Sequence, residues 1–219
     1  MTHTANAQLT HVADMYTVHR AFRREFRLIP GLVRDVRAGD TARAAVLAFH
    51  GRMILDGLHL HHTSEDDLLW PKLLERCPPD EELILRMEGQ HSQVEDLTGR
   101  LRAALDRFEA EARPAVAEEV AATFEALSDV LLVHLDEEER HILPLAARHV
   151  TQEEWDQIGE AGLAKMTRKQ LPLMIGAGLE DATPEEKAHM YGKVPPPVRV
   201  LAKTLFAWQY ARYVRKVRG

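Results

Sequence analysis

The sequence contains very little cysteine and no long apolar run, and both absences narrow the class of protein. Cys77 is the single cysteine, so no disulfide can form within the chain, which favours a reducing, cytoplasmic setting. No uninterrupted apolar segment reaches the length needed to cross a bilayer, and the N-terminal stretch lacks the apolar core of a secretory signal. We therefore expect a cytoplasmic protein without a transmembrane segment.

Basic residues are outnumbered by acidic ones, 28 to 34, so the formal net charge at pH 7 is -6. An acidic chain is a poor general binder of nucleic acid, whose phosphates require many Lys and Arg contacts, so we expect no nucleic-acid partner. The sequence also lacks a phosphate-binding loop and a paired nucleophile and base, which argues against phosphoryl transfer and hydrolysis. Hydrophobic residues make up 45% of the 219 positions, enough for a substantial core.

Apolar residues recur at steps of three and four along most of the chain, which is the period of an amphipathic helix, and no strand pattern competes. We predict four long helices, at about residues 5–36, 41–74, 80–111 and 114–149. Pro30 and Gly31 are expected to kink or interrupt the first helix, and Pro78 with Pro79 ends the second. Short turns force neighbouring helices to be antiparallel, so the predicted fold is all-α, an up-down-up-down antiparallel four-helix bundle.

The residues after this bundle are predicted to form shorter helices. The sequences TQEE at 151–154 and TPEE at 183–186 are both capping boxes, which start a helix. The sequence VPPP at 194–197 reads as a rigid spacer before a last helix at about residues 198–217. We therefore divide the chain into a bundle, residues 1–150, and a C-terminal helical extension, residues 151–219, which packs on the bundle or forms a small subdomain.

The last predicted helix is basic and aromatic, and the stretch from Tyr191 to Gly219 that contains it has seven Lys or Arg and no acid. One interpretation is a helix that binds a membrane surface or an anionic partner. The interpretation that the sequence favours is that its apolar residues pack on the bundle and its basic residues face outward. These apolar residues are Leu201, Leu205, Phe206, Trp208 and Tyr213.

An internal repeat carries the strongest functional signal. The segment HHTSEDDLLWP begins at His61, and the segment HLDEEERHILP begins at His134, 73 residues later. In both segments the first histidine is followed by a glutamate four residues on and by a proline six residues after that. A lone histidine precedes each segment, His19 by 42 residues and His91 by 43. The repeating unit is thus a pair of helices, used twice.

The spacing within the repeat suits metal binding. Residues i and i+4 lie on one face of a helix, so a histidine and a glutamate four residues apart can reach one metal ion together, while the lone histidines approach from facing helices. The candidate metal ligands are His19, His61, Glu65, His91, His134 and Glu138. Two sets of two imidazoles and one carboxylate, with positions left open, suit iron or manganese better than a closed structural zinc site.

With these motifs the sequence resembles the hemerythrin family, in its HHE cation-binding branch, over about residues 8–149. The resemblance implies a four-helix bundle that holds two non-haem iron ions, bridged by Glu65 and Glu138 and by an oxo or hydroxo group. It also implies that one iron position is open to a small molecule, which would be dioxygen, peroxide or nitric oxide. The resemblance does not indicate a protein partner.

The sequence departs from the oxygen-carrying members of that family at one place. Those members have a second histidine on the third helix, one turn from the first, whereas the positions four residues from His91 hold Met87 and Glu95. The iron on that side would therefore have an extra open site, a water or the Glu95 carboxylate. Tyr16, three residues before His19, is a further candidate to face the site. The departure weakens the case for reversible oxygen carriage and favours redox turnover, sensing or peroxide chemistry.

A shifted register is an alternative, because His62 and Asp66 repeat the four-residue spacing one position later. Their counterparts in the second half are Leu135 and Glu139, and a leucine cannot bind a metal. We therefore assign His62 to a supporting or surface role rather than to the ligand set.

Two classes of function stay open. The first is a redox enzyme that decomposes peroxide or acts as an oxidase; the second is a sensing module in which oxygen or iron occupancy changes the surface seen by a partner, without turnover. Ferritin-like iron handling is a third interpretation, because residues 88–91 and 138–141 have the E-x-x-H spacing of that class. It fails at the second helix, where Leu68 stands three residues after Glu65.

Overall fold

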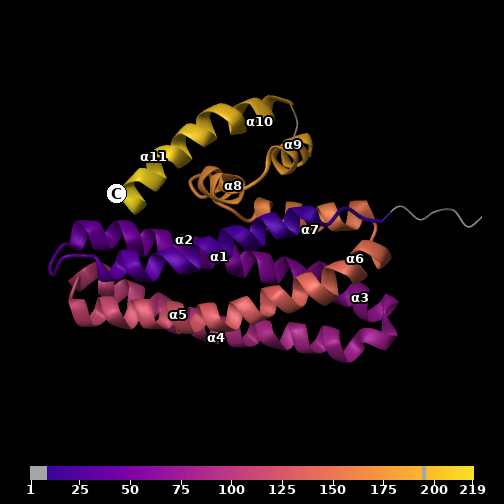
Figure 1. Cartoon of the computed structure of the whole chain (residues 1–219), viewed down its shortest axis with the longest axis horizontal. Coiled ribbons are helices and arrows are strands. Elements are labelled where there is room, and N and C mark those ends of the chain that lie inside the picture. The colour runs from indigo at the N-terminus through magenta and orange to yellow at the C-terminus, as the bar shows by residue number, and fades with distance from the viewer. Residues whose placement is uncertain (1–8, 194–195) are drawn as a thin grey trace, which may run out of the picture.

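The computed structural model describes residues 9–193 and 196–219, and over these residues the chain is helical and contains no strand. The predicted all-α fold is therefore confirmed. The longest helices lie side by side along the molecule (Figure 1) and are α1 (Ala13–Arg34), α2 (Thr41–Leu68), α4 (Glu81–Glu111) and α5 (Pro114–Glu137). α1 packs on α5, α5 on α4, and α4 on α2. No helix in the described part of the chain is long and apolar enough to cross a membrane.

The chain remains helical beyond α2 and α5, but not as the unbroken helices predicted to about residues 74 and 149. The continuing segments are α3 (Trp70–Arg76), the π-helical η2 (Glu138–Ile142) and α6 (Leu143–His149). Pro71 and Pro144, the two prolines of the repeat, lie in the first turn of α3 and α6. Because proline has no N–H to donate to the preceding turn, the helix loses a backbone hydrogen bond at each of these positions. The break falls at Leu69 in the first half and in η2 in the second.

Two other helix boundaries differ from the prediction. The first helix begins at Ala13 and residues 9–12 are not helical, while the predicted start near residue 5 lies outside the described residues. α1 runs through Pro30 as far as Arg34, so the proline does not interrupt it. A short 3-10 turn, η1 (Pro78–Asp80), separates α3 from α4, as the paired prolines there predict.

Two apolar clusters fill the space between the long helices, one on either side of a polar layer. Leu58 of α2 belongs to the first cluster, and Leu69, the residue directly after α2, belongs to the second. On α4 the corresponding residues are Val94 and Met87. The candidate ligands of both helices come between these positions in the chain. The sequence also predicts a dry apolar wall around the candidate ligands, and the residues predicted to form it are all buried: Met15, Phe22, Met53, Leu58, Leu69, Trp70 and Ile142.

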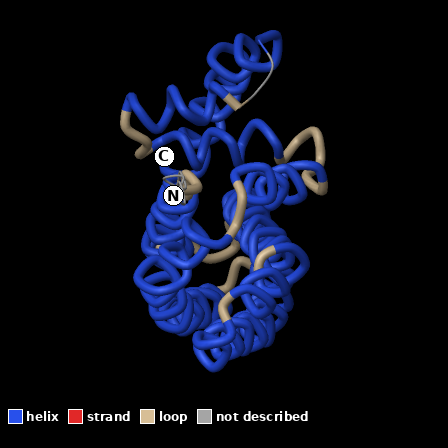
Figure 2. The backbone as a smooth tube through the Cα atoms, turned by 90° about the vertical axis from the view of Figure 1, so that its right-hand side faces the viewer, coloured by secondary structure: helices blue, strands red, loops and turns tan. Residues whose placement is uncertain are grey.

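The extension consists of short helices stacked on one side of the long ones, as the view from the end of the molecule in Figure 2 shows. These helices are α7 (Gln152–Ala164), α8 (Leu171–Glu180), α9 (Pro184–Gly192), α10 (Pro196–Leu201), the π-helical η3 (Ala202–Phe206) and α11 (Ala207–Arg218). α7 packs on α2, and α8 lies between α1 and α11. Both predicted capping boxes are present, at Thr151 with Glu154 and at Thr183 with Glu186.

The predicted VPPP spacer lies partly outside the described residues, because Val194 and Pro195 are not described. Pro196 and Pro197 form the first turn of α10 rather than a non-helical link. Proline is well suited to a first turn, where an N–H has no partner within the helix.

Buried polar groups join the extension to the long helices. Glu25 of α1 is 2% exposed, and its carboxylate accepts hydrogen bonds from Arg24 (2.8 Å), from Arg218 of α11 (3.0 Å) and from Nε2 of His50 (3.1 Å). Nδ1 of His50 lies 2.8 Å from the hydroxyl of Tyr213, also on α11. His50 lies eleven residues before His61, close to the same helix face, and its position predicts a core or boundary histidine with satisfied hydrogen bonds rather than a ligand. The structure confirms this, since His50 is buried and both ring nitrogens have partners.

The prediction that the apolar residues of the last helix pack on the bundle is wrong for three of the five. Leu201 is 38% exposed, Leu205 is 42% exposed and Trp208 is 54% exposed. Tyr213 does face inward, through its contact with His50. α11 and η3 pack chiefly on α8, and α11 also contacts α2, but the opposite side of the segment, which carries these three residues, is exposed.

Candidate metal centre

All six candidate ligands converge on the polar layer, and they come from four different helices. α1 contributes His19, α2 contributes His61 and Glu65, α4 contributes His91, and α5 with η2 contributes the remaining two. Their potential ligand atoms fall into two groups, within each of which the atoms lie no more than 4.8 Å apart. The first group is His19, His61 and Glu138, and the second is His62, Glu65, His91 and His134.

The two glutamates lie between the two groups. One oxygen of Glu65 is 3.4 Å from Nε2 of His61, and its other oxygen is 3.6 Å from Nε2 of His91. Oε2 of Glu138 is 3.3 Å from Nε2 of His19 and 3.7 Å from Nε2 of His134. Each carboxylate therefore touches one imidazole of each group, which is the arrangement that a bridging carboxylate requires.

The polar atoms at the centre of the cluster have no hydrogen-bond partners. Both oxygens of Glu65, both oxygens of Glu138 and the Nε2 atoms of His19, His61 and His62 are buried and unpaired. Leaving a buried polar group without a partner costs about 1–3 kcal/mol, and more for a charged group. So many unpaired atoms pointing at a common space fit a cation bound there, and the donor set suits a metal ion.

Outward hydrogen bonds fix the tautomer of three of the histidines. Nδ1 of His19 is 2.9 Å from Glu139, and Nδ1 of His91 is 2.7 Å from Asp66. Nδ1 of His134 is 3.0 Å from the side-chain oxygen of Gln90. Because these oxygens only accept, each Nδ1 carries the proton and donates it, which leaves the lone pair of Nε2 facing inward.

The contact between the rings of His91 and His134 also favours a bound cation. Nε2 of His91 lies 3.2 Å from Nε2 of His134. With both Nδ1 atoms protonated, neither neutral ring has an Nε2 proton to donate, so two lone pairs face each other. A metal ion bound by both nitrogens removes this repulsion.

Burial keeps most of the imidazoles neutral. It lowers the pKa of His61 to about 3 and that of His134 to about 4, and it lowers the pKa of His62 well below the ordinary value. Burial would also lower the pKa of His19, but the adjacent carboxylates of Glu138 and Glu139 outweigh it and raise that pKa. A neutral imidazole is the form that binds a metal.

The pKa values of the two carboxylates shift in opposite directions. Burial, followed by the charge of Glu138, raises the pKa of Glu65 well above the ordinary value. Burial acts in the same direction on Glu138, but the neighbouring imidazoles, His19 above all, outweigh it and lower its pKa to about 2. Two carboxylates this close and this buried cannot both be charged unless a cation compensates them.

His62 is the residue that the sequence prediction left out of the ligand set. It is 6% exposed, its ring stacks on that of His91, and its Nε2 is one of the unpaired buried atoms. The comparison of the two repeats excluded it because Leu135 is its counterpart. A usable signal was its spacing of three residues from Glu65, since i and i+3 also share a helix face.

The other residues considered as additional ligands lie away from the cluster. The side chain of Glu95 is 60% exposed and pairs with His59 (3.3 Å), so it does not supply the missing ligand near His91. Tyr16 and His141 are exposed as well. Exposure of His141 removes the E-x-x-H pair at 138–141 on which the ferritin-like interpretation rests.

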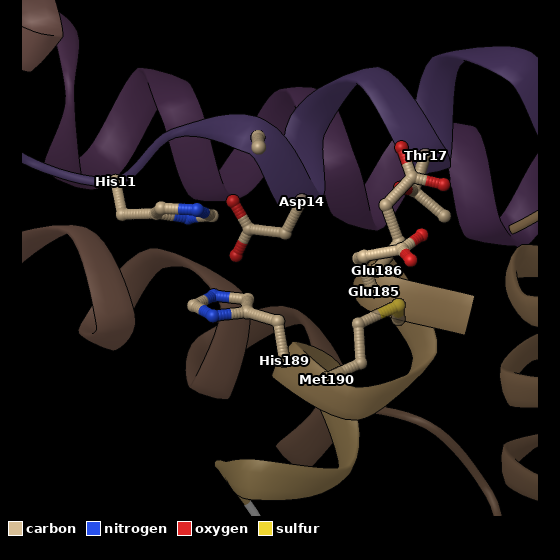
Figure 3. Close-up of a pocket in the computed structure, with 8 residues that line it drawn as sticks. His11, Asp14, Thr17, Glu185, Glu186, His189 and Met190 are labelled. Carbon is tan, nitrogen blue, oxygen red and sulfur yellow. The ribbon is translucent and has the colours of Figure 1, made fainter. Parts of the chain in front are cut away.

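A separate small cavity of about 120 Å³ lies between the start of α1 and α9 (Figure 3). The rings of His11 and His189 stand 4.1 Å apart at its edge. Asp14 points toward them, but its oxygens already accept from Trp155 (2.9 Å) and Lys193 (2.8 Å). None of the residues that line this cavity belongs to either group of candidate ligands.

Comparison with known protein families gives one match. The family described as the hemerythrin HHE cation binding domain matches residues 10–146, which include every member of both ligand groups. No curated protein and no solved structure gives a significant match to the chain.

Proposed function

Because the chain belongs to the hemerythrin family of HHE cation-binding domains, we propose that it is a non-haem di-iron protein. We propose further that it binds dioxygen, peroxide or nitric oxide at the iron pair. The observation that carries the proposal is the set of unpaired buried oxygens and nitrogens at the centre of the cluster. Imidazole with carboxylate is a ligand combination that suits iron.

The proposed ligand set has seven members. His19, His61 and Glu138 hold one iron, and His62, Glu65, His91 and His134 hold the other. Glu65 and Glu138 bridge the two ions, and the support for this is that each carboxylate lies within 3.7 Å of an imidazole from either group.

The two groups are unequal, and this supports a location for the open position. Three imidazoles belong to the second group and only two to the first. We therefore propose that the small molecule binds on the side of His19 and His61. The ring of Phe22 stands 5.5 Å from that of His61 and contributes an apolar wall there. The sequence argued against reversible oxygen binding because the third long helix supplies one histidine where oxygen carriers have two. His62 provides the additional imidazole, so this argument no longer applies.

When bound, the iron pair supplies reversible binding of the small molecule and any change of oxidation state. The protein supplies orientation and shielding. Nδ1 of His19 donates its proton to a carboxylate oxygen of Glu139 2.9 Å away, so the lone pair of Nε2 stays directed inward. The apolar clusters on either side exclude water and tune the redox potential of the site.

An experiment on the iron-loaded protein separates binding from turnover. The reduced protein is titrated with nitric oxide and with dioxygen under an optical spectrometer, and peroxide consumption is followed at steady state. A saturable spectral change with stoichiometric peroxide use supports binding or sensing, whereas sustained consumption supports an enzyme. Absence of any spectral change with all three molecules overturns the proposed function.

We also propose the organisation of the whole chain. In the described part of the chain, the residues up to 150 form an up-down-up-down antiparallel bundle, and those from 151 onward form an extension packed on it. The proposal is supported by the turns between the long helices, which alternate between the two ends of the molecule in Figure 1.

A further inference from the structure

The C-terminal helical segment, residues 196–218, forms the outermost layer of the molecule (Figure 1). It comprises α10, η3 and α11, and it packs mainly on α8. A helix covered on one side only is expected to be polar on the other side. This one is not.

Apolar side chains are exposed along the uncovered side. Val198, Leu201, Leu205 and Trp208 follow one another at steps of three, four and three residues, and all four are exposed. Val200 is exposed as well, at 63%. Large apolar residues at helical spacing, left in water, mark a surface that another apolar phase covers.

The charged residues of the segment itself are all basic, and of these Arg218 is paired with Glu180 and Glu25 of neighbouring helices. Residues 191–219 contain seven Lys or Arg, and all 34 acidic residues of the chain lie before them. The guanidinium of Arg212 sits over the ring of Trp208, 5.7 Å from its centroid. Arg215 and Lys216 are exposed on the next turn. The occupant of this surface is therefore both apolar and negatively charged.

We propose that the C-terminal helical segment binds an anionic lipid surface, with its apolar residues in the headgroup boundary and its basic residues on the lipid phosphates. Amphipathic helices with Lys and Arg on the polar face and with Trp and Leu on the other lie in the membrane interface in this manner. Trp prefers that interface because its ring is apolar and its N–H is polar. Lys and Arg reach the headgroups while their alkyl stems cover apolar surface.

An acidic protein groove would match the charge too, but two features favour lipid. The exposed apolar residues form a row from Val198 to Trp208 on an outermost segment, which a fluid surface can cover without a matching shape. The basic residues at Arg212, Arg215 and Lys216 follow the apolar row at one end, so that the row can enter the headgroup layer while they remain at its edge.

The tryptophans make a site-specific test possible. Of the three tryptophans, Trp70 and Trp155 are buried and Trp208 is exposed. The full-length protein is mixed with vesicles of phosphatidylcholine containing phosphatidylglycerol, and with vesicles of phosphatidylcholine alone. We expect co-sedimentation with the anionic vesicles only, a blue shift of the Trp208 emission, and weaker binding as the ionic strength rises.

Paired variants assign the binding to this segment. Reversing two charges by Arg212→Glu with Arg215→Glu should weaken vesicle binding at least about tenfold, because each basic residue near the surface contributes separately. Arg37→Glu with Arg100→Glu makes the same charge change at exposed sites elsewhere and should leave binding unchanged.

A second pair of variants, one test and one control, measures the contribution of the exposed apolar residues to vesicle binding. Val200→Ser with Leu205→Ser should reduce binding and the blue shift, whereas Leu85→Ser with Val133→Ser, at comparably exposed positions on α4 and α5, should change neither.

Three results would overturn the proposal. The first is a lack of binding to anionic vesicles by the wild-type protein. The second is equal loss of binding in the test and control variants. The third is concentration-dependent self-association that the Arg212 and Arg215 reversals abolish while vesicle binding is absent, since that would identify the surface as a contact between copies of the chain.

Discussion

The imidazoles of His62 and His91 stack face to face, with ring centroids 3.9 Å apart and planes inclined by 7°. The two residues come from α2 and α4, and the stack leaves Nε2 of His62 buried and unpaired. This relationship brings a fifth imidazole to the candidate centre, at the place where the third long helix supplies only one histidine.

The first prediction concerns His62. His62→Ala should remove one ligand of the second group and lower iron affinity by more than the roughly 10- to 100-fold typical of losing an outer hydrogen-bond partner. His59→Ala is the matched control, because His59 is three residues away on the same helix with an exposed side chain. Iron bound per chain after dialysis, measured by elemental analysis, checks the prediction. Equal iron retention in the two variants would show that His62 is not a ligand.

The second prediction concerns the carboxylate behind His91. Asp66 accepts from Nδ1 of His91 at 2.7 Å and from Nε1 of Trp70 at 2.9 Å, so it orients the imidazole. Asp66→Asn should weaken iron binding about 10- to 100-fold. Asp67→Asn, at an exposed neighbour that faces Lys165, should not. Competition with a coloured chelator gives both affinities, and an unchanged affinity in Asp66→Asn would contradict the orienting role.

These residues show what the sequence could and could not predict. The six repeat-based candidates were recognisable because a four-residue helical spacing and a shared proline register are visible in one dimension. His62 was not, because its reach toward α4 depends on how α2 is rotated against its neighbour. The partner of His134, Gln90, was missed for the same reason: nothing in a lone glutamine distinguishes it until two helices are packed together.

The third prediction concerns pH and the buried Glu25. Burial alone would raise its pKa, but His50 and Arg24 outweigh burial and lower the pKa to about 2, from 4.5 when unperturbed. The native pKa lies below the unfolded one, so this contribution to stability is fully present above about pH 4.5 and is lost as the pH falls toward 2. We estimate it at roughly 3 kcal/mol.

Urea unfolding of the wild type and of Glu25→Gln checks this dependence. The difference in unfolding free energy between them should be largest near neutral pH and should shrink between about pH 5 and pH 3. Glu118→Gln, at an exposed partner of Arg34, serves as the control for a surface ion pair. A difference that stays constant over this pH range would contradict the role assigned to Glu25.

The fourth prediction concerns the contact of α8 with α11. A Cβ added at Gly176 would lie 2.2 Å from Cγ of Tyr210 and 2.5 Å from its Cβ, so the two helices would have to separate. Gly176→Ala should destabilise the extension by about 1–3 kcal/mol. At Gly178 an added Cβ meets nothing within 4 Å, and Gly178→Ala should stabilise α8 by about 0.5–1 kcal/mol.

Amide hydrogen exchange in α11 measures both effects. Faster exchange in Gly176→Ala, with unchanged or slower exchange in Gly178→Ala, is the expected outcome. Identical exchange in the two variants would mean that Tyr210 does not set the helix spacing.

The extension also marks the limit of sequence reasoning about the fold. Both capping boxes were predictable, since the hydrogen bonds at Thr151 and Thr183 are made within four residues. The exposure of Leu205 and Trp208 was not, because it depends on α8 covering one side of the segment while nothing covers the other.

The central claim is that the buried histidines and glutamates hold a pair of iron ions. The most direct measurement is the iron content and optical spectrum of the purified protein, compared with those of a His61→Ala, His134→Ala double variant. A His59→Ala, His141→Ala double variant, which alters two exposed histidines, is the control. We predict about two irons per chain and the charge-transfer bands of an oxo-bridged pair in the wild type and the control, with both lost from the first variant. Near-native iron content in that variant would contradict the claim.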